Sequence, residues 1–515
     1  MLLKRRLLEN KKLNSKIRSQ KILIQTICPS PVIRFPVTQA PSLNSSKQRS
    51  SSNKAEPTSP VSARQLALNA LRQVHQGAYA DVAIDRSLKS QKLEDRDRRL
   101  FTEIVYGAVR RQRTLDAAID ALATKPANQQ PPNLRVLLHI GLYQILFLDH
   151  IPSSAAVDTT VDLAKKNGLT GLAGFVNGLL RKLVRTLEED ATETDGEFNV
   201  SAIEKLLKTN DKNRLGIYYS YPDWMTAQWV KQFGQDETEA LCEWMNNPPH
   251  LDIRLTGRTM QKKELQKVLE ALDIVVTEIP YAPMGLRLSH SPGGIQELPG
   301  FKSGDWIVQD ASAQLVGQLV DPQPGETVAD VCAAPGGKTV HLAELMQDKG
   351  CVIALDKTAS RLRKIHQNCD RLGLTSVQVK EGDVRLVKDW VNLCDRVLVD
   401  APCSGLGTLH RHADARWRQT PETVTQLAEL QLEILTAAST WVKPYGKLVY
   451  STCTIHPLEN EEVIKNFLAQ NPTWHIDPLD PASPLADLAT PDGWIQVLPH
   501  HHDMDGFFMV RLKKG

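Results

Sequence analysis

The sequence predicts a multidomain protein in which an all-α domain is followed by a small α/β module and a larger α/β domain with a doubly wound parallel sheet. The chain has 515 residues, enough for roughly two to four domains. Apolar residues recur at helical spacing through residues 61–187, where no strand alternation occurs. From about residue 306 short β-branched runs alternate with helical segments, which is the pattern of a parallel sheet covered by helices.

Residues 1–60 have the composition of a targeting segment and linker. The first 55 residues hold twelve Lys or Arg and one acidic residue, Glu9, and they are rich in serine. Because they lack the apolar core of a secretory signal, they are predicted to be an organelle transit peptide. The chloroplast is favoured, with the mitochondrion or cytoplasm as alternatives. A disordered basic arm that binds RNA is the other interpretation of this charge.

The all-α domain is expected over residues 61–187. Ala67, Leu68 and Leu71 are spaced for one face of a helix. Further helices are expected over 115–123, 134–148, 155–166 and 172–187. The apolar run at 134–148 is too short to cross a bilayer and contains Arg135 and His139, so it is predicted to be a buried helix.

The second half of the chain divides into two parts after a polar linker at 188–214. A small α/β module is expected over 215–300, with strands at 251–255 and 274–278. The larger α/β domain then occupies 301–515.

A glycine-rich loop follows a buried apolar strand at 327–331 and opens a helix. Its residues are Cys332, Ala333, Ala334, Pro335, Gly336, Gly337 and Lys338. Glycine lets the backbone approach a ligand closely at the carboxyl ends of parallel strands. The dinucleotide fingerprint is absent, and an ATP-binding P-loop would need glycine where the chain has Cys332. A nucleoside-type cofactor remains.

Three acidic residues stand at the ends of successive predicted strands: Asp356, Asp383 and Asp400. Asp356 is placed to bind ribose hydroxyls, and Asp383 to contact an adenine edge. Each aspartate alone could cap a helix, but three at one sheet edge favour a ligand site.

Two cysteines lie where further strands reach the same edge. Cys403 follows Asp400-Ala401-Pro402, and Cys453 lies within Tyr450-Ser451-Thr452-Cys453-Thr454. A thiolate that adds to carbon 6 of a pyrimidine makes carbon 5 able to accept a methyl group, which is covalent catalysis. Asp400, if protonated, is a candidate donor near ring nitrogen 3. The residues alone do not decide which cysteine attacks. The eight cysteines form no CxxC pair and are predicted to be reduced thiols.

These motifs resemble those of the RsmB/Sun-type ribosomal RNA cytosine-5 methyltransferases, in the Nop/Sun family. The resemblance rests on residues 330–339, 400–407 and 451–454 and covers about 215–515. Residues 61–187 are similar to the NusB-like RNA-binding domain. The resemblance therefore implies a NusB-like domain followed by a Rossmann-like methyltransferase domain, with an RNA-binding role for the small module between them.

The resemblance also implies the chemistry. S-adenosyl-L-methionine would be the methyl donor, bound by the residues from Cys332 to Lys338 and by Asp356, Asp383 and Asp400. Cys453 would attack the base and Cys403 would assist product release. The substrate would be small-subunit rRNA. A tRNA substrate and a non-catalytic rRNA-binding assembly factor are the alternatives. We expect a monomer, with no membrane, DNA or metal partner.

Two further segments carry expectations. The loop His410–Arg418 is basic with one aromatic residue, Trp417, and is predicted to contact phosphate and to stack on a base. Three consecutive histidines at 500–502 have no further ligands near them in the sequence, so a metal site is not expected.

Overall fold

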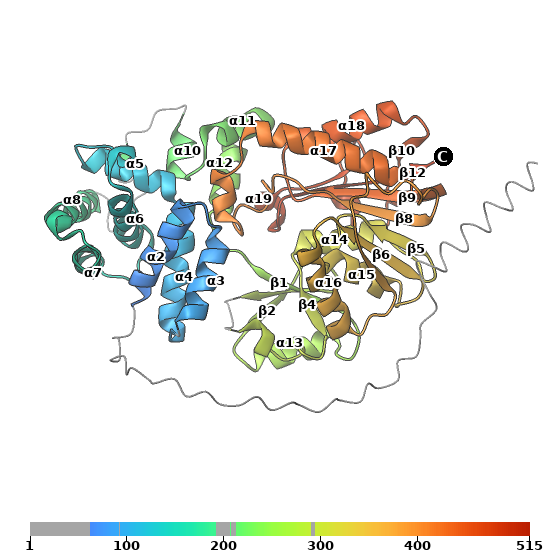
Figure 1. The fold of residues 1–515 in the computed structure, drawn as a ribbon, viewed down its shortest axis with the longest axis horizontal. Helices are drawn as coiled ribbons and strands as arrows, with labels where there is room; N and C mark the ends of the chain where they lie inside the picture. Colours follow the sequence, from blue (N-terminus) through green and yellow to red (C-terminus); the bar gives the residue numbers. More distant parts are fainter. Residues whose placement is uncertain (1–61, 92, 192–205, 208–212, 290–293) are drawn as a thin grey trace, which may run out of the picture. The chain divides into compact units, whose positions relative to one another are not determined.

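The computed structural model describes residues 62–91, 93–191, 206–207, 213–289 and 294–515 (Figure 1). The chain divides into two compact units. The helical unit holds the described residues up to Pro248 together with Leu409–Arg418, and the sheet unit holds Pro249–Thr408 and Gln419–Gly515. The predicted transit segment and most of the predicted linker at 188–214 lie outside the described residues.

The helical unit is built around the apolar helix α6, Pro132–Phe147. Most of the side chains of α6 are buried, so the prediction of a buried helix is confirmed. Its Tyr143 packs directly on Gly107 of α4, where an added Cβ would lie 1.9 Å from the tyrosine ring. The phenol of Tyr143 donates to Glu103 at 2.6 Å, which satisfies its hydroxyl at this close contact.

The remaining helices of this unit surround α6 or follow it. They are α2 Ala63–His75, α3 Ala80–Ser90, α4 Asp95–Arg110, α5 Gln112–Leu122, α7 Ser153–Lys166, α8 Ala173–Ala191, α10 Arg214–Tyr218, α11 Asp223–Phe233 and α12 Gln235–Trp244. Among the described residues, none of the helices is long and apolar enough to cross a membrane. The helices α10–α12, which precede the strands of the small module, group with the helical unit.

The segment Leu409–Arg418, which includes the 3-10 helix η4 Ala413–Trp417, is part of the helical unit. Arg416 is fully buried there. Its guanidinium donates to the carbonyl of Ser220 and to Oδ1 of Asn246, both at 3.1 Å, and lies 4.1 Å over the ring of Tyr221. The indole of Trp417 donates to the carbonyl of Val109 at 2.8 Å.

The expectation that Arg416 of this loop contacts phosphate is therefore wrong, whereas base stacking by Trp417, whose side chain is partly exposed, stays a prediction. Several backbone and amide oxygens converge where the planar guanidinium of Arg416 can donate to them. The guanidinium of Arg416 and the indole N–H of Trp417 therefore both make their hydrogen bonds inside the fold.

The sheet unit begins with a four-stranded antiparallel sheet in the order β2-β3-β1-β4. The strands are β1 Leu251–Leu255, β2 Val275–Glu278, β3 Gly285–Ser289 and β4 Trp306–Val308, with α13 Lys262–Glu270 packed on them. The two strands predicted for the small module are present. The structure adds β3 and assigns Trp306–Val308, expected to open the larger domain, to this sheet.

The large sheet has the order β10-β12-β9-β8-β5-β6-β7, with β11 paired to β12. Its parallel strands are β5 Thr327–Asp330, β6 Cys351–Asp356, β7 Val377–Glu381, β8 Cys394–Asp400 and β9 Val442–Thr452. Three antiparallel strands complete it: β10 Trp474–Ile476, β11 Ile495–Val497 and β12 Phe507–Lys514. The predicted doubly wound sheet is confirmed, with these antiparallel strands added at one side.

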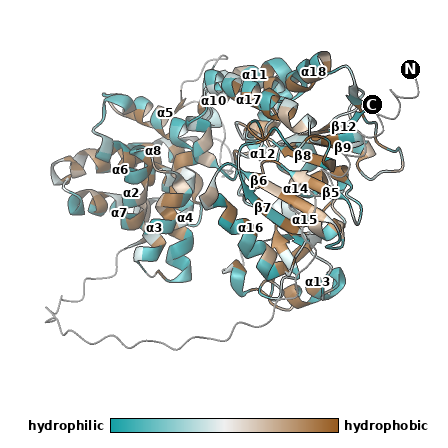
Figure 2. Ribbon diagram, turned by 45° about the vertical axis from the view of Figure 1, so that its right-hand side comes forward, coloured by the Kyte–Doolittle hydropathy of each residue, from teal (hydrophilic) through white to brown (hydrophobic). Residues whose placement is uncertain are grey.

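Helices cover both faces of the large sheet (Figure 1). One face is covered by α17 Pro421–Ser439 and α18 Glu461–Gln470, and the other by α14 Ala311–Val320, α15 Gly337–Leu345 and α16 Ala359–Leu372. Alternate residues of one strand serve the two cores: Val397 and Val399 of β8 face one, and Leu398 faces the other. Figure 2 shows the resulting hydropathy, with hydrophobic strands and a largely hydrophilic α16.

The strand order decides where a ligand can bind. β5 pairs with β6 on one side and with β8 on the other. The strand order therefore reverses at β5: β6 and β7 follow on one side, and β8 and β9 on the other. Crevices in parallel sheets form at such a point, outside the carboxyl ends of the strands.

Candidate active site

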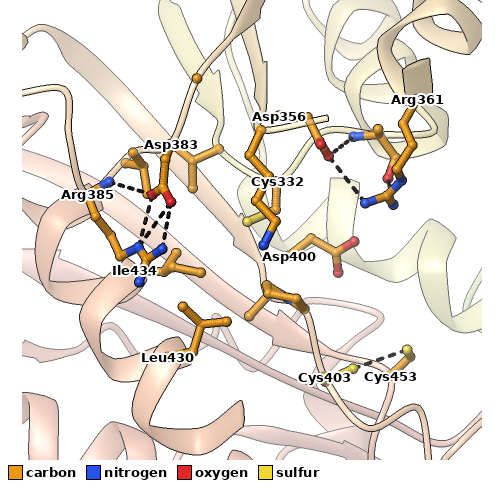
Figure 3. Close-up of a pocket in the computed structure, with 17 residues that line it drawn as sticks. Cys332, Asp356, Arg361, Asp383, Arg385, Asp400, Cys403, Leu430, Ile434 and Cys453 are labelled. Carbon is orange, nitrogen blue, oxygen red and sulfur yellow. Dashed lines mark hydrogen bonds and ion pairs between the residues drawn. The ribbon is translucent and has the colours of Figure 1, made fainter. Parts of the chain in front are cut away.

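A cavity of about 220 Å³ lies at the carboxyl ends of the parallel strands (Figure 3). Seven of the residues predicted for the site line it: Cys332, Ala334, Asp356, Asp383, Asp400, Cys403 and Cys453. The other predicted residues, Ala333, Pro335, Gly336, Gly337 and Lys338, are not among its lining residues. The first four of these build the loop, and Lys338 contacts the cavity wall through Asp400.

The glycine loop, Cys332–Lys338, is held between strands β5 and β6. The Ala333 amide donates to the carbonyl of Leu355 at 2.9 Å, and the Ala334 amide donates to Asp356 at 3.2 Å. Gly336 has a φ of 103°, and a Cβ there would lie 3.2 Å from Cα of Ile365. Glycine is thus required at 336 both by the backbone conformation and by the close approach of α16.

Asp356 ends β6 and is buried beside this loop. Its carboxylate accepts from the amides of Ala334 at 3.2 Å and Thr358 at 2.9 Å. Arg361 lies 3.6 Å from the same carboxylate and donates to the carbonyl of Ala334 at 2.6 Å (Figure 3). Asp356 therefore joins the loop, the strand end and the first turn of α16.

Asp383 is paired with an arginine that the sequence did not single out. The guanidinium of Arg385 donates to both carboxylate oxygens of Asp383, at 2.7 Å for the shortest contact (Figure 3). It also donates to Glu433 at 2.7 Å. These hydrogen bonds lower the pKa of Asp383, so the carboxylate is charged near neutral pH. A ligand at Asp383 would share this carboxylate with Arg385.

Asp400 accepts two hydrogen bonds at the end of β8. Nζ of Lys338 donates at 2.7 Å and Oγ of Ser451 donates at 2.9 Å. Burial alone would lower the pKa of Lys338, but the charge of Asp400 and its hydrogen bond outweigh burial, with a smaller contribution from Cys453, and the pKa is raised. Lys338 is therefore charged where it donates to Asp400.

The structure brings the two predicted thiols together. Sγ of Cys403 lies 3.3 Å from Sγ of Cys453, and both cysteines are free (Figure 3). Two backbone hydrogen bonds connect the loops that carry them. The Ala401 amide donates to the carbonyl of Ser451 at 2.9 Å, and the Gly407 amide donates to the carbonyl of Cys453 at 3.0 Å.

The two sulfurs differ in their surroundings. The hydrogen bond with Cys453, then burial, then the charges of Cys453 and Glu459 raise the pKa of Cys403 well above that of an ordinary thiol. Cys403 therefore holds its proton at neutral pH.

Four of the remaining cysteines, Cys242, Cys332, Cys369 and Cys394, are free thiols, as predicted. Cys28 lies outside the described residues.

The sequence also did not predict the apolar wall of the cavity. It comes from Leu430 and Ile434 on α17, which begins at Pro421 with a capping box between Thr420 and Thr423. Residues four apart on a helix share a face, so the spacing of the two could have indicated a common surface. Nothing in the sequence, however, indicated that this face meets the strand ends.

Comparison with known proteins places the chain in a family. A family model described as "16S rRNA methyltransferase RsmB/F" matches residues 317–513. A "NusB family" model matches 61–185, and a ferredoxin-like domain model of the RsmF/B type matches 221–293. A probable ribosomal RNA small subunit methyltransferase B of Synechocystis is 48% identical over 459 residues, covering 88% of this chain and 100% of that protein. The chain belongs to the RsmB/F methyltransferase family.

Other relatives agree with this assignment. A probable ribosomal RNA small subunit methyltransferase B of Bacillus subtilis is 36% identical over 460 residues, covering 88% of this chain and 99% of that protein. A solved structure titled "Crystal Structure of PH0851" is 27% identical with a TM-score of 0.71, covering 88% of this chain and 99% of the other. As an RsmB/F family member, the chain has the predicted order of domains: NusB, ferredoxin-like module and methyltransferase domain.

Proposed function

We propose that this protein methylates carbon 5 of a cytosine in small-subunit rRNA, with S-adenosylmethionine as the methyl donor and a covalent bond from Cys453 to carbon 6. The supporting observation is the pair of free thiols, 3.3 Å apart, at the wall of the cavity. Family membership supports methyl transfer, and the names of the relatives support the rRNA substrate.

The residues around the cavity fit S-adenosylmethionine. Asp356 stands at the end of the strand after the glycine loop, where a carboxylate binds ribose hydroxyls. Leu430 and Ile434 give an apolar wall suited to an adenine ring. When bound, the cofactor supplies an electrophilic methyl carbon. The remaining steps depend on side chains of this chain.

Cys453 is the better nucleophile of the pair. Its thiolate is attracted by the Lys338 ammonium, as the contribution of Cys453 to the raised pKa of Lys338 indicates. Cys403 retains its proton and is a poor nucleophile in that form. Attack of Cys453 at carbon 6 forms the S–C6 bond and moves the ring electron pair to carbon 5, which takes the methyl group.

Product release reverses the attack. Water that reaches the site takes a proton from carbon 5, the electron pair of that C–H bond restores the C5–C6 double bond, and the S–C6 bond breaks with its electrons on Cys453. A Cys403 thiol held 3.3 Å away donates a hydrogen bond to the departing thiolate. Lys338 is a charged donor in the same site, and it offers an alternative to a protonated Asp400 as the donor to the ring.

The test is a denaturing gel of labelled small-subunit rRNA with S-adenosylmethionine and three proteins: wild type, Cys403→Ala and Cys453→Ala. We expect a persistent protein–RNA adduct with Cys403→Ala, methyl transfer without a persistent adduct in wild type, and neither with Cys453→Ala. An adduct with Cys453→Ala alone would exchange the two roles. If no protein reacts with rRNA, tRNA is tested next. Cofactor binding without transfer to either RNA would support an assembly factor.

We further propose that the NusB domain and the ferredoxin-like module bind the RNA, that the enzyme is a monomer and that it acts in the chloroplast. The localisation rests on the composition of residues 1–55. A fluorescent protein fused to residues 1–60 would accumulate in chloroplasts. Signal in mitochondria or throughout the cytoplasm would reject the chloroplast.

A further inference from the structure

A buried carboxylate lies behind the two thiol loops. Glu459, the last residue of the 3-10 helix η5 Pro457–Glu459, is fully buried. Its Oε1 accepts from the amide of Ser404 at 2.8 Å and from Nε2 of Gln431 at 3.0 Å, and its Oε2 accepts from the hydroxyl of Ser404. Three donors therefore converge on this one side chain.

These contacts link Glu459 to both cysteines. Ser404 follows Cys403 in the chain, and its hydroxyl lies 3.0 Å from the hydroxyl of Thr454, which follows Cys453. Burial raises the pKa of Glu459, and a hydrogen bond from Thr454 is among the weaker contacts that act in the opposite direction.

Gln431 and Tyr450 complete the hydrogen-bond network around Glu459. Nε2 of Gln431 also donates to the carbonyl of Pro402 at 2.9 Å, and the Tyr450 hydroxyl donates to the Glu459 carbonyl at 2.5 Å. Residues on both sides of Cys403 are thus held by Glu459 or by its partner Gln431. Buried networks of this kind fix geometry because each unsatisfied member would be costly.

We propose that Glu459 is a positioning residue, which holds the two thiols against each other through Ser404 and Thr454. The catalytic roles given to Cys403 and Cys453 rest on the proposed function, but the positioning of the two thiols by Glu459 does not. The negative charge of Glu459 is one of the influences that raise the pKa of Cys403.

Glu459→Gln tests this positioning, because glutamine has nearly the same shape but only one terminal oxygen and no charge. Its amide nitrogen cannot accept a hydrogen bond, so one of the two Ser404 donors loses its acceptor. We expect the kcat of methyl transfer to fall about tenfold or more, with the KM for RNA within about threefold, as expected for a change in the reacting groups alone.

Thiol alkylation gives a readout that requires no RNA. Iodoacetamide labelling of Cys403, resolved by mass spectrometry across pH, should shift to lower pH by about one unit in Glu459→Gln, because a nearby negative charge has been removed. The spacing is tested with oxidised glutathione, which takes two electrons as the two thiols lose their protons and form a disulfide. Compared at the pH at which Cys403 is half labelled in each protein, this bond should form more slowly in the variant than in the wild type.

The matched control is Glu462→Gln, on α18, whose side chain is 47% exposed and pairs with Lys465. It should leave kcat, labelling and disulfide formation at wild-type values. If Glu459→Gln does not fold by circular dichroism, Ser404→Ala removes the hydroxyl contact alone and should give a smaller shift in the same direction. Unchanged labelling and disulfide formation in a folded variant would overturn the proposal. Shifted labelling in a protein that methylates no RNA would retain the positioning and reject the proposed function.

Discussion

Lys338 donates a 2.7 Å hydrogen bond to Asp400, and this ion pair joins the glycine loop to the strand that leads to Cys403. The ammonium also lies 5.0 Å from the centre of the Phe507 ring. The loop and the thiol site are therefore electrostatically coupled.

This coupling predicts that Lys338→Met lowers the rate of methyl transfer far more than cofactor affinity. Removing a preorganised charged donor typically costs about 10²–10³ in rate. Single-turnover transfer and calorimetric binding of S-adenosylmethionine measure the two effects. Lys349→Met, at an exposed lysine, is the control. A loss of binding as large as the loss of rate would mean that Lys338 serves the cofactor instead.

Asp356 is predicted to contribute to cofactor binding. Asp356→Ala removes the carboxylate that fixes Ala334 and Thr358, and the affinity for S-adenosylmethionine should fall about tenfold or more. Equilibrium binding measures this, with Asp370→Ala on the outer face of α16 as the comparison. Wild-type affinity in folded Asp356→Ala would remove Asp356 from the site.

Asp330 should make stability depend on pH. Burial raises its pKa to about 7, although a hydrogen bond from Thr339 acts in the opposite direction. A carboxyl group whose pKa is raised on folding stabilises the fold fully below the pKa of the unfolded chain, near 4. That contribution is lost as pH rises to about 7, at most about 4 kcal/mol.

Urea unfolding of wild type and Asp330→Asn at pH 5 and pH 8 tests this. Asparagine cannot ionise, so the wild type should lose more free energy of unfolding between the two pH values than the variant. Equal losses would show that Asp330 does not ionise in this range.

Arg416→Ala should destabilise the helical unit without changing how RNA binding depends on salt. The substitution leaves the carbonyl of Ser220 and the side chain of Asn246 without this donor, at a cost of about 2–4 kcal/mol. Thermal unfolding measures the stability, and the slope of log RNA affinity against log salt concentration measures the RNA contact. Arg99→Ala, at an exposed arginine, is the control. A lower salt slope with unchanged stability would restore the RNA-contact interpretation.

The sequence predicted the parts of this molecule that depend on local pattern. The buried helix α6, the strands of the parallel sheet and the meeting of Cys403 with Cys453 follow from periodicity and from strand ends sharing an edge. The residue-level roles of the predicted site remain predictions.

What the sequence missed depends on tertiary partners. Arg385 and Leu430 reach the cavity from segments with no motif of their own. Arg416 has the composition of a surface contact, yet backbone oxygens distant in sequence bind it in the interior. Hydrophobic patterning shows which face is apolar but not which element covers it.

The position of Leu409–Arg418 in the helical unit has a consequence for any attempt to separate the two halves of this protein. A fragment cut before residue 249 would lack Arg416, leaving Tyr221 and Asn246 without the guanidinium they hold. The complementary fragment would carry the same segment without its binding site. Each fragment would therefore be incomplete at this point, and a division of the chain that spares the helical unit would have to keep Leu409–Arg418 with it.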